Sequence, residues 1–311
     1  MKPSCYLGLR VVSFATLLLW LTSSTATAAQ TAAPHGIKSI ALGIIAQKSQ
    51  KQIEEHFLPF ITYVAKKLGA GRDVEASVVI VPTPLQMAIL LGERRIDFYM
   101  ESPYPTYVVN KQGAAGLLLR RWKSGMAEYR SLIFARKNSA TRRLEQLRGA
   151  MMAFEDSGST SGYFLPKVLL LKKGFNLTEK PRPDAPVRRD EIGYVFAFTH
   201  GEVLNWVLSN RVVAGAFSSD DFGALDQERR SNIAVLAQTD LFPRHLVSVR
   251  KDFNPTAKKH LKEILLSMHR DKEGQKIMQQ IDNTTRFDVL PGGEEMVRRK
   301  MLETFRPSQN K

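Results

Sequence analysis

The chain contains the stretch FEDSGSTSGY at residues 154–163, which is typical of a strand end, a small polar turn and the first turn of a helix. The first backbone N–H groups of a helix have no partner inside it, and the helix dipole places partial positive charge there. Ser159, Thr160 and Ser161 add hydroxyl groups, and Gly162 lets a ligand approach the backbone closely. The stretch therefore predicts a strand followed by a helix whose start binds a phosphate-like oxyanion.

A simple helix cap is the other interpretation of these residues, because Ser159 or Thr160 can accept hydrogen bonds from the free N–H groups. A catalytic serine does not fit, since a nucleophile elbow needs Gly-x-Ser-x-Gly and the residue midway between Gly158 and Gly162 is Thr160. A P-loop does not fit either, because its Gly-Lys-Ser/Thr ending is absent. A cap and a ligand site remain the two alternatives.

Residues 1–29 have the pattern of a cleavable secretory signal peptide. Lys2 and Arg10 precede an apolar run at residues 11–21, and Ala-Thr-Ala follows at residues 26–28. The run is shorter than the roughly 20 residues that span a bilayer, and no later run of the sequence is long and apolar enough to do so. We therefore expect a soluble protein in the periplasm.

Cysteine content and charge exclude several classes of protein. Cys5, the only cysteine among 311 residues, lies ahead of the apolar run, so the mature chain is expected to have no thiol, disulfide or attached lipid. The formal net charge is +15, but the basic residues form scattered pairs such as Arg120-Arg121 instead of a tract interleaved with aromatic residues. This pattern disfavours nucleic-acid binding. A field that attracts small anions, or solvated surface charge, accounts for it.

Strand-like and helix-like segments alternate along the chain. Strands are expected at residues 40–45, 77–81 and 96–100, with helices at residues 53–68 and 85–91 between them. Such alternation is typical of βαβ units on mostly parallel sheets. The fold class is therefore α/β.

Two segments, at residues 129–136 and 245–250, look like connections between two lobes. The first lobe is expected to comprise residues 30–128 plus 249–311, and the second lobe residues 129–248 with the hinge strands. Two crossings are what a clamp that closes on a ligand requires.

Motifs over nearly the whole chain after the leader resemble those of the phosphonate, phosphite and phosphate substrate-binding proteins of ABC transporters. The most specific is Ser-Thr-Ser-Gly-Tyr at residues 159–163, and weaker ones are Ile96-Asp97, Tyr129-Arg130-Ser131 and Thr199-His200-Gly201-Glu202. The resemblance implies the type II periplasmic binding protein fold, with two α/β lobes joined by two hinge crossings.

The resemblance also implies site residues on the second lobe and the hinge. In relatives, the positions that match Ser159, Thr160 and Ser161 hold phosphonate oxygens. Tyr129 would donate a phenolic hydrogen bond from the hinge, and His200 a ring N–H.

On the first lobe, the stretch ESPYP at residues 101–105 ends a strand and opens a helix. Ser102 and Tyr104 are expected to face the serine turn, as we call residues 159–163. The alternative is a capped helix with Tyr104 packed in the core. Glu101 would repel an anion there unless it pairs with an arginine or accepts a proton from the ligand.

Relatives that take aminoalkyl phosphonates surround the amine with acidic residues. Asp221 or its neighbour Asp220 matches one of these positions, but another falls near His245, which is not acidic. Arg244 and His245 together are better suited to a second anionic group or to a smaller oxyanion. An amine-specific pocket is therefore not expected.

The sequence thus predicts a periplasmic solute-binding protein. It would close two lobes over a phosphate-like oxyanion or organophosphonate and deliver it to an inner-membrane ABC permease. We expect a monomer that binds no nucleic acid, metal or cofactor and is not an enzyme, because no nucleophile with a paired base is evident. The alternative is a periplasmic ligand sensor that docks on a membrane histidine kinase or similar receptor.

Overall fold

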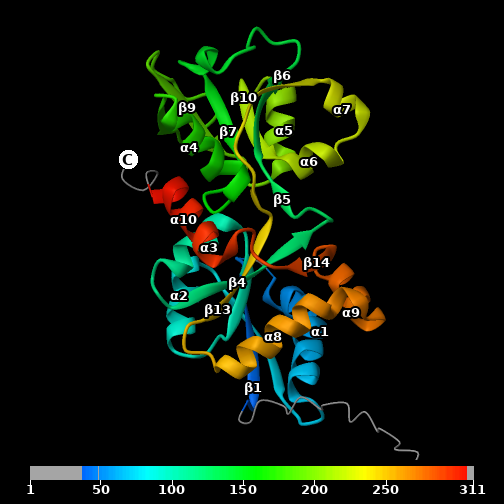
Figure 1. The fold of residues 1–311 in the computed structure, drawn as a ribbon. Coiled ribbons are helices and arrows are strands. Elements are labelled where there is room, and N and C mark those ends of the chain that lie inside the picture. Colours follow the sequence, from blue (N-terminus) through cyan, green and yellow to red (C-terminus); the bar gives the residue numbers. More distant parts are fainter. Residues whose placement is uncertain (1–36, 48, 307–311) are drawn as a thin grey trace, which may run out of the picture. The chain divides into compact units, whose positions relative to one another are not determined.

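Two six-stranded sheets form the framework of the protein (Figure 1). The computed structural model describes residues 37–47 and 49–306, which belong to one compact unit of the chain. The expected signal peptide at residues 1–29 lies outside the described residues. Within the described ranges, every helix is too short or too polar to cross a membrane.

The first sheet has the strand order β14-β4-β13-β3-β1-β2. β1 runs parallel to β2 and β3, whereas β13 is antiparallel to both β3 and β4, and β14 is antiparallel to β4. Its strands are β1 (Ser39–Ile45), β2 (Glu75–Val81), β3 (Phe98–Glu101), β4 (Ala115–Lys123), β13 (His245–Arg250) and β14 (Thr284–Asp288).

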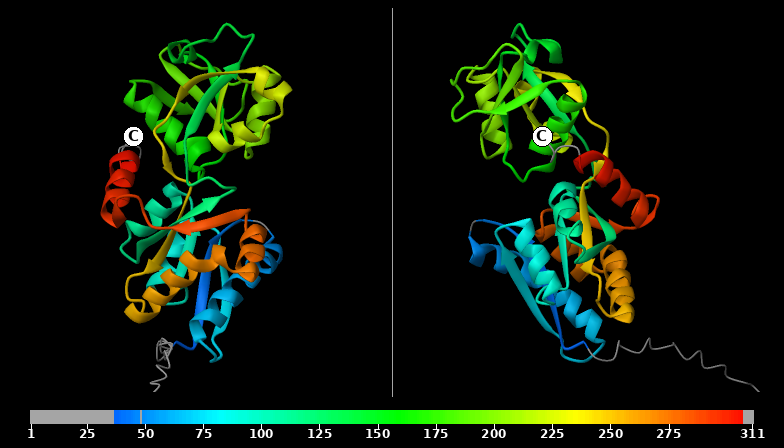
Figure 2. Two further views of the ribbon diagram at one scale, coloured as in Figure 1. Left: turned by 45° about the vertical axis from the view of Figure 1, so that its right-hand side comes forward. Right: turned by 90° about the vertical axis from the view of Figure 1, so that its left-hand side faces the viewer.

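Helices from both ends of the chain accompany this sheet. α1 packs beside α8 and α9 although they are far apart in sequence, as the further views also show (Figure 2). The apolar core between them contains Phe60, Val64, Leu261 and Phe287, all fully buried. The helices are α1 (Gln50–Gly69), α2 (Pro84–Gly92), α3 (Pro103–Asn110), α8 (Pro255–Ser267), α9 (Lys272–Gln280) and α10 (Gly293–Phe305), with the 3₁₀ turn η3 (Met268–Arg270).

The second sheet has the order β11-β6-β10-β7-β9-β8. β7 runs parallel to β9 and β10, and β8 parallel to β9, whereas β6 is antiparallel to β10 and β11. Its strands are β6 (Ser131–Arg136), β7 (Met151–Phe154), β8 (Asn176–Glu179), β9 (Glu191–Phe196), β10 (Ala214–Ser218) and β11 (Ile233–Gln238). Its helical segments are η1 (Leu144–Leu147), the π-helical turn η2 (Thr160–Phe164), α4 (Leu165–Lys172), α5 (His200–Leu208), α6 (Ser219–Ala224) and α7 (Gln227–Ser231).

The chain passes between the two sheets twice. It leaves the first sheet after β4, runs through β5 (Glu128–Tyr129) into β6, and returns from β11 through β12 (Phe242–Pro243) into β13. β5 and β12 pair with each other, with Phe242 opposite Tyr129. The division into lobes stays a prediction, and its expected boundary between residues 248 and 249 falls inside β13.

Both sheets are mixed. The expectation of mostly parallel sheets holds for the second sheet, where three of the five strand pairs are parallel, and is wrong for the first, where three of five are antiparallel. Most antiparallel pairs involve β6 and β13, the strands at which the chain enters each sheet after a crossing, and the β14–β4 pair adds one at the edge of the first sheet. β4 was not predicted from the sequence, because Arg120, Arg121 and Lys123 interrupt its apolar run. Their charges are satisfied by acidic residues from other elements, which no local pattern reveals.

Candidate functional site

The serine turn begins directly after β7. Ser159 caps η2, because its Oγ accepts a hydrogen bond from the Gly162 N–H at 3.0 Å. The same Oγ donates to Glu155 Oε2 at 2.7 Å. A Cβ on Gly162 would lie 2.5 Å from the Cβ of Glu155, so only glycine permits this close approach. Ser159 is therefore a helix cap in this structure, and its role toward a ligand stays a prediction.

Thr160 connects the serine turn to the start of α3. Its buried Oγ1 donates to Ser102 Oγ at 3.0 Å and accepts from the backbone N–H of Tyr104 at 3.0 Å. The ring of Tyr104 stacks on Phe164, which follows in η2. Two segments separated by 58 residues in the sequence thus meet through hydroxyl and amide groups. Tyr104 contributes its backbone here, while its ring packs against an aromatic neighbour.

Glu101 lies at the same place, as the last residue of β3. Its Oε2 accepts hydrogen bonds from the Ser102 N–H at 2.7 Å and from the Ser102 Oγ at 3.1 Å. Burial raises the pKa of this carboxyl above its usual range, while the Ser102 donors and the charges of Lys123 and Arg121 act in the opposite direction. The first lobe therefore places a carboxyl group one hydrogen bond from Ser102.

Tyr129 is buried at the β5–β12 pair, where the chain crosses between the sheets. Burial raises its pKa to about 12, although Arg244 and the side chains of Thr160 and Ser161 lower it. The Arg244 guanidinium lies 4.5 Å from the centre of the Tyr129 ring and is held by Asp220 at 2.6 Å. Tyr129 is therefore a neutral hydroxyl group next to the serine turn.

His200 and Asp221 lie on the other side of the serine turn. His200 is the exposed first residue of α5, and its Nδ1 is 3.9 Å from Asp221 Oδ1. Asp221 also accepts hydrogen bonds from the N–H and Oγ of Ser218, which closes the cap of α6. Both side chains influence the pKa of Glu155. Burial raises this pKa, Asp221 raises it further, and His200 lowers it.

His245 lies beside the cations that also act on Glu101 and Tyr129. It is buried at the start of β13, with its Nδ1 3.4 Å from Nη1 of Arg121. Burial, together with Arg121, Arg244 and Lys123, holds its pKa well below the usual value, so the ring is neutral at pH 7. Its expected partner Arg244 is already paired with Asp220. The structure thus brings Ser102, Tyr104, Tyr129, Ser159, Thr160, Ser161, His200 and Asp221 into one region, while His245 lies in the buried cationic cluster next to Arg121.

Arg121 was expected to be scattered surface charge, and this expectation is wrong. Its side chain is 2% exposed and binds Asp282 Oδ2 at 2.7 Å, with further hydrogen bonds to Thr284 and to the Ile281 carbonyl. A signal was present in the sequence, because Arg121 lies two residues after the apolar Leu119, on the same face of β4. Glu155 was also missed as a neighbour of the site, although it lies four residues before Ser159.

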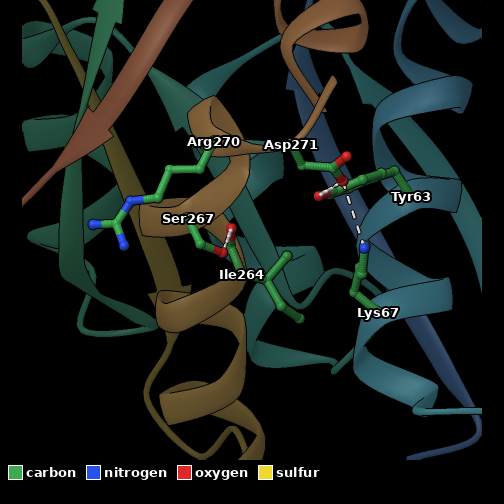
Figure 3. Close-up of a pocket in the computed structure, with 6 residues that line it drawn as sticks. All are labelled: Tyr63, Lys67, Ile264, Ser267, Arg270 and Asp271. Atoms are coloured by element: carbon green, nitrogen blue, oxygen red, sulfur yellow. Dashed lines mark hydrogen bonds and ion pairs between the residues drawn. The ribbon is translucent and has the colours of Figure 1, made fainter. Parts of the chain in front are cut away.

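A surface pocket elsewhere in the molecule does not involve these residues. It has a volume of about 230 Å³ and lies between α1 and the end of α8 (Figure 3). In this pocket, Asp271 accepts a hydrogen bond from the Tyr63 hydroxyl at 2.7 Å and lies 3.5 Å from the Lys67 ammonium group. Among the described residues, no cluster of His, Cys, Asp and Glu has the arrangement of a metal site.

Similar solved structures identify the fold. The fold is similar to XAC2383 from Xanthomonas citri bound to ATP (TM-score 0.79, 24% identity, 88% of this chain and 98% of that chain). It is also similar to PhnD1 from Prochlorococcus marinus in complex with methylphosphonate (TM-score 0.63, 18% identity, 88% and 98%). The alkanesulfonate-binding protein SsuA from Xanthomonas axonopodis pv. citri has a TM-score of 0.50 at 14% identity (88% and 93%). The chain therefore has the type II periplasmic binding protein fold.

The family follows from a match over most of the chain. The family model described as "ABC transporter, phosphonate, periplasmic substrate-binding protein" matches residues 42–290. The chain belongs to this family, whose members are periplasmic binding components of transporters and are not enzymes.

Proposed function

We propose that this protein captures a phosphate-like oxyanion or an organophosphonate and presents it to an inner-membrane ABC permease. The observation that carries the proposal is the meeting at Thr160, whose hydroxyl contacts both the Ser102 hydroxyl and the Tyr104 amide. Hydrogen-bonding groups from both lobes converge there within 3.0 Å of one atom.

Hydrogen-bond donors near this point support an anionic ligand. The Tyr104 N–H at the start of α3 donates to Thr160 Oγ1 at this point, and Tyr129 adds a neutral phenolic donor. A tetrahedral oxyanion has enough acceptor positions to bind donors from both lobes at once. A ligand that bridges the lobes stabilises the closed arrangement because it has the higher affinity for that state.

The names of similar proteins support the same ligand class. They include a complex with methylphosphonate, an alkanesulfonate-binding protein and a complex with ATP, which have a tetrahedral phosphorus or sulfur group in common. For this chain we propose the phosphorus ligands, namely alkylphosphonate, phosphite or phosphate. The amine-bearing phosphonates are disfavoured because Asp220 is already paired with Arg244 and Asp221 is engaged in the α6 cap.

Substitution of Tyr129 by phenylalanine tests the proposal. Tyr129→Phe keeps the buried ring and its contact with Arg244 but removes the phenolic donor. We expect affinity for methylphosphonate, phosphite or phosphate to fall about tenfold, since a hydrogen bond to a charged group contributes about 1.5 kcal/mol or more. Isothermal titration calorimetry would measure it.

The matched control is Tyr63→Phe, which removes a phenolic hydroxyl that is bonded to Asp271 between α1 and α9. It should leave ligand affinity unchanged. Equal affinities of the Tyr129→Phe variant and the unmodified protein for all three anions would contradict the assignment of Tyr129. Failure of the unmodified protein to bind any of them would contradict the proposed ligand class.

A further inference from the structure

Three turns of the second sheet meet at the edge where its parallel strands begin. β7, β9 and β8 are neighbours in the sheet and run in the same direction. Their pairing places Met151 of β7 opposite Gly193 of β9, and Asn176 of β8 opposite Glu191, so the three strand starts lie close to one level. The serine turn follows the other end of β7, at the opposite edge of the sheet. The edge with the three turns is therefore separate from the candidate site.

Arg148, in the turn before β7, joins the other two turns. Its guanidinium donates to the Gly174 carbonyl at 3.2 Å, in the turn before β8, and to the Asp190 carbonyl at 3.5 Å, in the turn before β9. The next residue, Gly149, donates its N–H to the Glu191 carbonyl at 2.7 Å. Three segments that are distant in the sequence are thus held together by hydrogen bonds at this edge.

Basic side chains gather on these turns. Lys172 and Lys173 lie in the turn before β8, and Arg188 and Arg189 in the turn before β9, beside Arg148. All five residues are exposed. Arg188 has acidic partners. In the ranges that the structure describes, Lys172, Lys173 and Arg189 form no ion pair. Basic pairs that are scattered along the sequence therefore form one cluster in the fold.

This cluster, which we call the cationic edge, offers charge without exposed apolar groups. Between residues 142 and 191, all of which the structure describes, no large hydrophobic side chain is exposed. A specific protein partner needs apolar or aromatic anchors at the centre of its interface. A surface of anionic lipid headgroups attracts clusters of Lys and Arg through charge. The cationic edge therefore fits a membrane surface better than it fits a protein.

From this placement we infer that the cationic edge is a docking surface for the anionic phospholipid headgroups of a membrane. Lipid phosphate groups accept charge-assisted hydrogen bonds from ammonium and guanidinium groups. Because the serine turn lies at the opposite edge of the same strands, lipid and ligand are bound independently. The inference thus goes beyond the proposed capture of a ligand. Docking of this kind raises the concentration of the protein next to the membrane that contains its transporter.

Vesicle sedimentation tests the inference. The chain from residue 30 onward is suitable, because it contains the whole described compact unit and lacks the apolar run at residues 11–21, which would itself bind lipid. We expect it to bind vesicles of equal parts phosphatidylglycerol and phosphatidylcholine, and not vesicles of phosphatidylcholine alone. Added NaCl should weaken the binding, since charges separated by more than about 10 Å are screened at 0.1 M salt.

Removal of the three unpaired cations should have a large effect. Each Lys or Arg near an anionic lipid surface contributes about fivefold in affinity. The triple variant Lys172→Gln/Lys173→Gln/Arg189→Gln should therefore bind phosphatidylglycerol vesicles about a hundredfold more weakly. The charge-preserving variant Lys172→Arg/Lys173→Arg/Arg189→Lys should bind as the unmodified protein does. A charge-preserving variant that binds as weakly as the neutral one would contradict an electrostatic role.

The matched control removes the same charge elsewhere. Lys258→Gln/Lys259→Gln/Lys262→Gln neutralises three lysines on α8, which accompanies the first sheet. It should weaken vesicle binding by no more than about twofold, because cations away from the lipid are screened by salt. Equal weakening by both neutral triple variants would show a general attraction of a basic protein to anionic lipid, and it would overturn the inference.

A single label locates the contact even if the neutral variant does not fold. Residues 30–311 contain no cysteine, so Asn176→Cys, at the exposed start of β8, can carry one polarity-sensitive fluorophore. Its emission should change on phosphatidylglycerol vesicles, whereas a label at Ser267→Cys, at the exposed end of α8, should not respond. The reverse pattern, or no binding to these vesicles, would overturn the inference. Binding to soluble polyglutamate but not to vesicles would also overturn it, and would assign the cationic edge to an acidic protein segment.

Discussion

Glu101 and Glu155 occupy equivalent places at the ends of β3 and β7, yet their surroundings differ. Each carboxyl accepts a hydrogen bond from the hydroxyl group of a serine at the start of the next helical segment. Burial raises the pKa of both. The charges near Glu101 are Lys123 and Arg121, which oppose this rise, whereas Asp156 and Asp221 near Glu155 add to it.

The comparison teaches that two carboxyl groups with the same local hydrogen bond can lie in different electrostatic surroundings on the two lobes. The cations near Glu101 favour its ionised form, against the larger effect of burial. The acids near Glu155 favour its neutral form, in the same direction as burial. The two carboxyl groups thus lie in different electrostatic surroundings, although their serines are held in the same way.

Removal of the cation beside Glu101 should have the largest effect on the protein. Arg121→Met leaves Asp282 partly buried without its 2.7 Å partner, so we expect the free energy of unfolding to fall by about 3 kcal/mol. It should also make the electrostatic surroundings of Glu101 more like those of Glu155, because Glu101 loses one of its two cationic neighbours. Urea denaturation followed by circular dichroism measures the stability.

The control for this change is Arg298→Met, which breaks an exposed pair with Glu295 on one helix. Exposed pairs contribute little, so the unfolding midpoint should not move. An Arg121→Met variant as stable as the unmodified protein would show that the buried pair does not hold β4 to the segment at Asp282.

Glu191 is a third glutamate for the comparison, and both of its carboxylate oxygens accept hydrogen bonds. It accepts hydrogen bonds from Lys180 Nζ at 2.6 Å, Thr178 Oγ1 at 2.6 Å and the Arg188 N–H at 3.1 Å, and these donors lower its pKa to about 2. The ionised form therefore stabilises the fold above the unfolded-state pKa of about 4.3, and this contribution is lost as the pH falls toward about 2.

We expect Glu191→Gln to lower the free energy of unfolding at pH 7 by about 2 kcal/mol and to flatten the loss of stability between about pH 4.3 and 2. Denaturation series at several pH values would test it. Glu179→Gln, which alters another glutamate of the same sheet, serves as the comparison. An acid transition of the Glu191→Gln variant that matches that of the unmodified protein would refute the assignment.

The smallest effect concerns the acidic neighbours of Glu155. Asp221→Asn removes one of the charges that raise the pKa of Glu155 and also reduces repulsion of an anionic ligand. We expect affinity for methylphosphonate to increase about threefold, the scale of one partly screened charge interaction. Calorimetry at low ionic strength measures it.

Asp226→Asn is its matched control, because Asp226 caps α7 on the same lobe but does not act on Glu155. It should leave the affinity unchanged. Weaker binding in Asp221→Asn would mean that Asp221 contacts the ligand favourably, as an amine-bearing phosphonate would require.

The local motifs were sufficient to predict much of this protein. The serine turn at residues 159–163 predicted the strand, the turn and the helical segment that the structure contains. The expected strands at residues 40–45 and 77–81 lie within β1 and β2, and the two crossings between lobes are present. Such features are encoded within a few residues, by side-chain alternation and by the free N–H groups at a helix start.

Tertiary structure alone decided which groups are paired, buried or free. Thr160 meets Ser102 across 58 residues, and Arg121 meets Asp282 across 161. The fold likewise decides that Arg121 is part of the core, that the hydroxyls of Ser102 and Ser159 donate hydrogen bonds to Glu101 and Glu155, and that both sheets are mixed. The physical reason is that burial and hydrogen-bond direction depend on partners brought together by the whole fold, whereas the sequence alone displays only neighbours along the chain.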